Sequence, residues 1–329
     1  MFDLVNAEST NAKELRPLGG PWTFFRRMRV LAANQVIEDI DNYNRVHEMF
    51  SVMTASDSRT NVYAEGFGQY WDTRDSATTG LNTTLLPGIK GGQSQTVLFK
   101  PLSGLLNQNK MIPIRYCPIT IELELVNNAT TPILSSLTGT FTAANTSLSW
   151  VISNVQAKVD MCTLDNSLDN SYAEHLLNGK ALPINFNTYV SQMQSLLSSA
   201  DAGQQKVRLN VTRALSRLNS VFVSLGKTPD MSITADVPYY LGRKEWNEFD
   251  SPMQPYAKGE FNKFNSDGEF EFQLQLGSTL FPEYPVRSHA EAYYQLRKTL
   301  GVQASTLHNF DIDSHEFRQW KFILGTDME

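Results

Sequence analysis

Residues 111–126 read Met111-Ile-Pro-Ile-Arg-Tyr-Cys-Pro-Ile-Thr-Ile-Glu-Leu-Glu-Leu-Val126. From residue 119 onward, Ile and Leu alternate with Thr and Glu, and this period of two is typical of a β-strand with one buried and one solvated face. The pattern therefore predicts a strand over residues 119–126. The side chains that we expect to point into a core are Ile119, Ile121, Leu123 and Leu125.

A matching stretch lies near the other end of the chain, where Glu and Gln alternate with Phe and Leu over residues 269–276. It predicts a second half-buried strand. The side chains that we expect to point inward there are Phe270, Phe272, Leu274 and Leu276. Further strands are predicted over 22–31, 95–99, 151–165, 182–194, 206–214 and 221–225, and the run 317–329 looks like the start of a strand or hairpin without its partner.

Helices are fewer. Apolar residues at helical spacing predict one over 36–50, and two more, over 170–179 and 288–300, combine a capping-box pair at the start with a glycine at the end. These end signals are Ser171 with Glu174, Gly179, Ser288 with Glu291, and Gly301. Many short strands, long polar loops and a few short helices indicate a mainly β, antiparallel architecture.

Composition limits the possible functions. The chain has 329 residues, enough for two cores of roughly 150 residues each. Its net charge of −6 repels phosphate, so the chain as a whole does not coat nucleic acid through counterion release. No run approaches the roughly 18 apolar residues that span a bilayer, and residues 1–10 lack the features of a secretory leader. We therefore expect neither a transmembrane segment nor secretion.

The chain has two cysteines, Cys117 and Cys162, and both lie in apolar stretches that resemble strands. This context favours buried, reduced thiols over a disulfide.

Candidate catalytic and metal-binding residues are few. The strongest metal candidate is a group of imidazole and carboxylate side chains in one short stretch, although its spacing matches no metal motif and favours a polar loop. This group is His308, Asp311, Asp313 and His315. The sequence contains no Gly-x-Ser-x-Gly, no phosphate-binding glycine loop and no His-Glu-x-x-His. We therefore predict no catalytic, cofactor or metal site, and no enzymatic activity.

Two charged clusters have structural interpretations. The acidic residues Glu38, Asp39 and Asp41 fall on the predicted helix over 36–50, where they indicate a solvated face with capping or interface roles. In the basic cluster Arg26, Arg27 and Arg29, the last two share one face of a predicted strand. Arginines in that position pair with acids on a neighbouring strand more often than they bind phosphate.

Four segments in order resemble the double jelly-roll major capsid proteins of double-stranded DNA viruses, most closely those of polinton-like viruses and virophages. They are 29–50, 112–126, 164–180 and 284–300. The resemblance implies a tandem double jelly roll, made of two antiparallel β-sandwich or barrel domains with a few short inserted helices. It implies a first jelly roll over 1–165, a connector with a short helix over 166–182, and a second jelly roll over 183–329. Members of the family are usually longer, so it also implies a chain that lacks its first and last strands.

The function that this resemblance implies is structural. Members form homotrimeric capsomers with a pseudo-hexagonal outline, which tile the icosahedral capsid of a virion assembled inside the host cell. The implied partners are further copies of the chain, neighbouring capsomers, and penton and minor capsid proteins, with no specific nucleic acid and no cofactor.

Two other classes of function fit the composition. A carbohydrate-binding β-sandwich module would use aromatic residues in loops, for which the candidates are Tyr63, Phe67, Tyr70 and Trp71. Packing of that loop on the core explains these residues more simply. An enzyme on a jelly-roll scaffold would need histidines gathered at a metal, whereas the 5 histidines lie in separate contexts.

Overall fold

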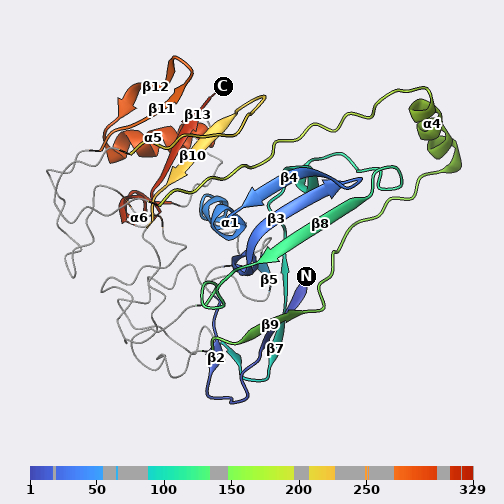
Figure 1. Cartoon of the computed structure of the whole chain (residues 1–329), viewed down its shortest axis with the longest axis horizontal. Coiled ribbons are helices and arrows are strands. Elements are labelled where there is room, and N and C mark those ends of the chain that lie inside the picture. The colour runs from blue at the N-terminus through green and yellow to red at the C-terminus, as the bar shows by residue number, and fades with distance from the viewer. Residues whose placement is uncertain are drawn as a thin grey trace.

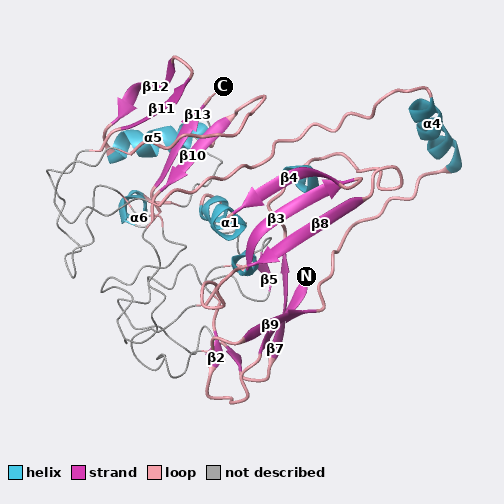
Figure 2. Cartoon of the chain, viewed as in Figure 1, coloured by secondary structure: helices cyan, strands magenta, loops and turns pink. Residues whose placement is uncertain are grey.

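The computed structural model describes residues 1–17, 20–54, 64–65, 88–133, 147–195, 207–226, 249, 251, 270–301, 312–319 and 321–328. Within these ranges the chain has more strand than helix (Figures 1 and 2). The strands are β1 (Phe2–Asn6), β2 (Glu14–Leu15), β3 (Phe25–Ala32), β4 (Gln35–Asp41), β5 (Ala64–Glu65), β6 (Ile89–Lys90), β7 (Ser94–Phe99), β8 (Ile119–Leu125), β9 (Trp150–Ser153), β10 (Ser220–Ser224), β11 (Phe272–Leu276), β12 (Thr279–Val286) and β13 (Ile323–Asp327). The helices are the 3₁₀ turn η1 (Pro21–Phe24), α1 (Tyr43–Val52), α3 (Gly104–Asn107), α4 (Asn166–Leu177), α5 (His289–Thr299) and α6 (Ser314–Gln319).

The strands form several small antiparallel sheets. One has the order β5-β7-β1-β9 and another the order β4-β3-β8, while β2-β6, β10-β13 and β11-β12 pair as two-stranded sheets. The described residues thus form a mixed α/β structure with more strand than helix, and the predicted mainly β fold is confirmed only in its antiparallel pairing. Because no sheet of the described residues has more than 4 strands, they do not display the closed eight-stranded wedge of a jelly roll.

The hairpin of β3 and β4 replaces the predicted start of a helix. Ala33 and Asn34 connect the two strands, and both have positive φ (47° and 67°), as a two-residue type I′ turn requires. Asn42, with φ 48°, then separates β4 from α1. The helix predicted over 36–50 is therefore wrong for its first turns, because pairing with β3 draws residues 35–41 into the sheet.

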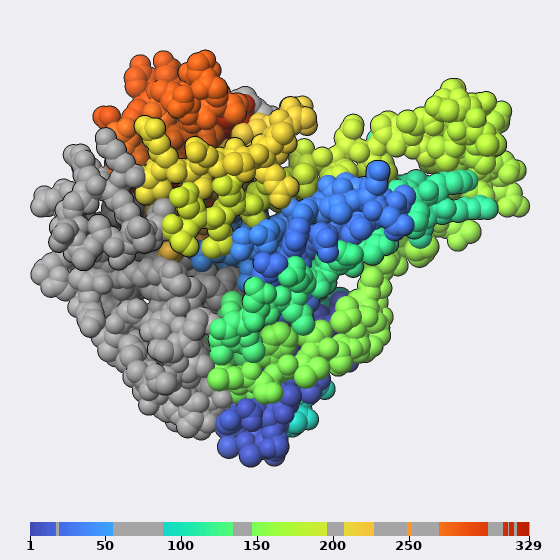
Figure 3. Space-filling view, viewed as in Figure 1, coloured from blue at the N-terminus to red at the C-terminus, as the bar shows by residue number. Residues whose placement is uncertain are grey.

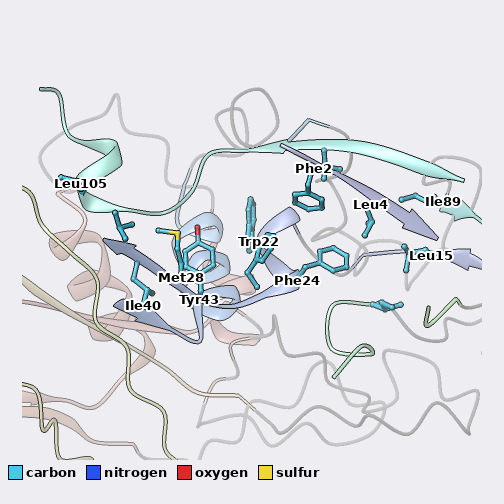
Figure 4. Close-up of a cluster of buried hydrophobic side chains, with 14 residues drawn as sticks. Phe2, Leu4, Leu15, Trp22, Phe24, Met28, Ile40, Tyr43, Ile89 and Leu105 are labelled. Carbon is cyan, nitrogen blue, oxygen red and sulfur yellow. The ribbon is translucent and has the colours of Figure 1, made fainter. Parts of the chain in front are cut away.

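Two clusters of buried apolar side chains form the described core. The first (Figure 4) gathers side chains from η1, β3, β4, α1 and the sheet around β1. The second lies around α5 and β13, and Val52 and Met53 at the end of α1 belong to it. Ile184, Phe186 and Tyr189 pack against the first cluster. Helix α1 contributes to both clusters, with Tyr43 in the first and Val52 in the second.

The two alternating stretches do form strands, but they are only partly covered. Ile119 and Leu123 pack against the first cluster, whereas Ile121 and Leu125 are 40% and 45% exposed. In β11, Phe272 packs on the second cluster and Leu276 is 54% exposed. The predicted burial of these side chains is wrong at Ile121, Leu125 and Leu276. The physical reason is that β8 and β11 are edge strands, each with a single described partner.

Other predicted elements have mixed outcomes. Strands β7 and β10 lie where 95–99 and 221–225 predict them, and the predicted capping box of Ser288 and Glu291 begins α5. Residues 154–165, 182–194 and 207–214 form no strand, and residues 22–24 belong to η1. The run 317–329 has a partner after all, because β13 pairs with β10.

Helix α4 begins before Ser171, so its predicted capping box is wrong, while Gly179 and Gly301 end their helices with φ 70° and 72° as predicted.

Candidate interaction surface

The outer face of the sheet β4-β3-β8 carries a ladder of ion pairs. Arg27 donates two hydrogen bonds to Asp39, at 2.8 and 2.6 Å. The flanking pairs are Arg29 with Glu122 and Arg26 with Glu124, both 2.7 Å between nitrogen and oxygen. The hydrogen bond from Arg27 lowers the pKa of Asp39. The arginine cluster thus pairs with acids on neighbouring strands, as the sequence predicts.

Register shifts explain why these charged side chains share a face. Between Phe25 and Arg27, β3 carries one residue more than β8, and this bulge turns Arg26 outward beside Arg27. A second shift, between Val30 and Leu31 on the β4 side, leaves Ile37 exposed and turns Glu38 inward.

Glu38 is the buried member of the predicted acidic cluster. Its carboxylate accepts hydrogen bonds from the backbone N–H of Gly104 (2.8 Å) and Leu105 (3.3 Å) and from the Ser103 hydroxyl. The prediction of a solvated helical face is wrong for Glu38, which is 1% exposed on a strand, but the predicted capping role is confirmed at the start of α3.

A second buried polar group holds α1 against η1. Trp22 donates to Glu48 at 2.7 Å, and its indole stacks on the His47 ring with centroids 4.0 Å apart. His47 Nε2 lies 3.2 Å from the carbonyl oxygen of Lys100, so Nε2 carries the proton of the neutral ring. Burial lowers the pKa of His47 to about 4. These side chains are closed to solvent, so the group is a structural one.

One side-chain pair that the sequence does not reveal joins Ser251 and His289. The Ser251 hydroxyl lies 2.6 Å from His289 Nε2, and Phe270 and Phe322 flank the imidazole. Burial, and after it the charge of Arg318, lowers the pKa of His289. The described residues supply no carboxylate partner for His289, so they do not assemble a catalytic triad around Ser251.

The feature that stands apart is a projecting arm, residues 154–183, which leaves β9, carries α4 at its tip and returns along the body (Figures 1 and 3). Near its base, Gln156 exchanges two backbone hydrogen bonds with Met1, at 2.9 and 3.0 Å. At its tip, Arg115 forms an ion pair with Asp169 of α4, and Tyr116 donates to the same carboxylate at 3.4 Å.

Helix α4 lacks the burial that usually stabilises a helix. None of its 12 residues is buried, and Leu168 and Leu177 are 47% and 87% exposed. Its end is well formed, because Gly179 N–H donates to Leu176 and Lys180 N–H to His175, which is a Schellman motif. Isolated helices of this length are marginal in water, and the described contacts of α4 include those of Asp169 with Arg115 and Tyr116.

Between the base of the arm and α4, the chain is extended and fully exposed. Val155, Val159 and Met161 are 64%, 72% and 70% exposed and alternate with Gln, Lys and Asp. Residues 157–164 make no backbone hydrogen bond to any described part of the chain. An alternating segment with unpaired backbone groups has the properties of a strand without a sheet. Together with α4 it forms the candidate interaction surface.

No family model, curated protein or solved structure matches this chain. Its surfaces must therefore be interpreted from their own chemistry. In the ranges that the structure describes, no helix is long and apolar enough to cross a membrane.

The remaining predicted site residues do not form a site in the described residues. His308, Asp311, Tyr63, Phe67, Tyr70 and Trp71 lie outside them. Asp313 Oδ1 accepts the backbone N–H of Glu316 at 2.7 Å at the start of α6, and no described group of three His, Cys, Asp or Glu residues could hold a metal ion.

The cysteines lie in less protected positions than the sequence predicts. Cys117 and Cys162 are free thiols, as predicted, but Cys117 is only half-buried and Cys162 is exposed. The burial prediction is wrong for Cys162 because it lies on the extended arm, where an apolar stretch has no core beside it.

Proposed function

We propose that this chain is a structural protein whose function is self-assembly, and that it is the major capsid protein of a double-stranded DNA virus. The observation that carries the proposal is the projecting arm. A monomer gains no stability by holding an alternating apolar segment and a 12-residue helix away from its core. A subunit that buries them against other chains does gain, because burying one large apolar side chain contributes about 1.5–3 kcal/mol.

The proposed fold of the subunit is the tandem double jelly roll, and the strand pairing supports it. β1 lies between β7 and β9, and β3 pairs with β8 some 90 residues later. Antiparallel pairing between strands so far apart in sequence is typical of Greek-key connections. The resemblance of four segments, in order, to double jelly-roll capsid proteins also supports this fold.

In this proposal the chain forms homotrimers with a pseudo-hexagonal outline, which associate with neighbouring capsomers and with penton and minor capsid proteins in the virion. It has no enzymatic activity of its own. The neutral ion-pair face and the net charge of −6 support protein partners over nucleic acid. The aromatic residues on which the carbohydrate-binding alternative depends lie outside the described residues.

The test is the mass of the purified chain in solution, measured by light scattering coupled to size exclusion. We expect a particle of three times the 37.0 kDa chain, because obligate interfaces commonly bury more than about 2,000 Å² and survive dilution. Negative-stain images should show a three-fold outline. A monomer at micromolar concentration would overturn the proposal.

A further inference from the structure

The arm and strand β8 have matching side-chain patterns. Arm residues 157–161 alternate apolar with polar side chains, as the residues of β8 do. Both segments have backbone groups without a described hydrogen-bond partner. Residues 157–164 have no described backbone hydrogen bonds, and β8 pairs with β3 alone among the described strands. On the core side of β8, Ile121 beside the buried Val30 remains 40% exposed.

We infer that the arm of one copy adds, as an antiparallel strand, to the edge of β8 that no described strand pairs with in a second copy. This inference rests on the proposed self-assembly and names the contact that performs it. Strand addition satisfies the backbone groups of both segments, and the apolar residues of the arm extend the covered face of the sheet.

Charge selects one register. Residues directly opposite each other in a sheet share a face, so Lys158 belongs beside an acid on the outer face of β8. Setting Lys158 opposite Glu122 in antiparallel orientation leaves Asp160 opposite Thr120, without a like-charge pair. Parallel addition with the same pair would set Asp160 against Glu124. The apolar pairs that follow from the antiparallel register are Ala157 with Leu123, Val159 with Ile121, and Met161 with Ile119.

The partner is a second copy of this chain, because the arm and the β8 edge to which it would add both occur on the same chain. Among the described residues the arm does not pair with β8 of its own chain: residues 157–164 make no backbone hydrogen bond to it, while Gln156 with Met1 and Asp169 with Arg115 fix the arm at its base and tip. Exchange of an identical element between protomers is a low-cost route to association.

Disulfide trapping between two differently tagged chains tests the register. Both chains carry Cys117→Ser and Cys162→Ser. One then carries Val159→Cys and the other Ile121→Cys, so that any bond between the two tags joins separate copies. Opposed residues in a sheet have the Cβ separation that a disulfide needs. The matched control replaces Val159→Cys by Lys158→Cys, which is one residue away but faces the other side of the sheet.

We expect the Val159–Ile121 pair to link most of the assembled protein after mild oxidation, and at least five-fold more than the control pair. An assembled protein that links neither pair, or both equally, overturns the arm contact and leaves the proposed function standing. A protein that stays monomeric overturns both. A chain carrying both Val159→Cys and Ile121→Cys that closes the bond within a monomer also overturns the inference, because the arm then covers its own sheet.

Discussion

Arg115, in the loop before β8, forms an ion pair with Asp169, in the first turn of α4. The pair fixes the tip of the arm beside the start of β8 in the same chain. Exposed ion pairs stabilise a fold by less than about 1 kcal/mol, so its effect should be local.

We therefore expect Arg115→Ala to leave the unfolding midpoint nearly unchanged and to speed amide exchange in α4 several-fold. Hydrogen exchange measured by mass spectrometry on the α4 peptides checks this. Arg287→Ala is the matched control, because it removes another exposed pair, with Glu271, away from the arm. Equal exchange in α4 for both variants would show that Arg115 does not hold the helix.

Charge placed on the apolar side of the arm should prevent assembly. We expect Val159→Glu to shift the protein to monomers, because a buried carboxylate without a partner costs several kcal/mol. The control adds the same charge on the other side of the segment, as Cys162→Glu, and should assemble normally. Light scattering reports both masses, and disassembly of the control to the same extent would show that total charge, not the apolar side, controls assembly.

His47 should make stability depend on pH. Its pKa in the folded protein is about 4, below the ordinary 6.5, so between these values the unfolded chain binds a proton that the folded chain does not. The contribution of His47 is fully present above pH 6.5 and is lost as pH falls to 4, by roughly 3 kcal/mol.

Urea unfolding at several values between pH 7 and pH 4 measures this slope. A His47→Gln variant, less stable at pH 7 because it loses the stack on Trp22, should show a shallower dependence over the same interval. Parallel curves for the two proteins would mean that His47 does not titrate as its burial requires.

The cysteines should differ in reactivity. Cys162 is exposed on the arm and Cys117 is half-buried, so we expect a thiol reagent to modify Cys162 several-fold faster in the folded monomer. Denatured, unreduced protein should titrate two thiols. A count of none would mean a disulfide and would contradict the structure.

Local pattern predicts the strands better than it predicts their partners. The alternation in β8 and the cap of α5 follow from residues close in sequence, and both are confirmed. The same reasoning predicts a helix over residues 36–50, because Ile37, Ile40 and Tyr43 fit helical spacing. This prediction is wrong for residues 36–41, because they pair with β3. Pairing is a contact between distant segments, and a local pattern does not contain it.

The arm shows the same limit in the candidate interaction surface. The sequence predicts a strand over 151–165, and the structure extends β9 only to Ser153. The alternation of Val155, Val159 and Met161 is a genuine signal for a strand, but the described chain gives this strand no sheet. If the arm adds to β8 of a second copy, the local prediction is correct for the assembled protein and wrong for the monomer.

Glu38 offers the sharpest test of the described core. It lies on β4 with 1% exposure and accepts hydrogen bonds from the backbone of Gly104 and Leu105 at the start of α3. Glu38→Ala leaves these donors buried without an acceptor, and we expect a loss of about 2–4 kcal/mol in the free energy of unfolding. Glu38→Gln keeps one acceptor oxygen and should lose about half as much.

The control is Glu124→Ala, which removes an acid of the same sheet from its exposed ion pair with Arg26 and should cost less than about 1 kcal/mol. Urea denaturation at pH 7 gives all three values. A Glu38→Ala variant as stable as Glu124→Ala would show that the inward turn of Glu38 after the β4 bulge is not part of the folded core. The first cluster and the sheet edge that we assign to the arm would then need a different register.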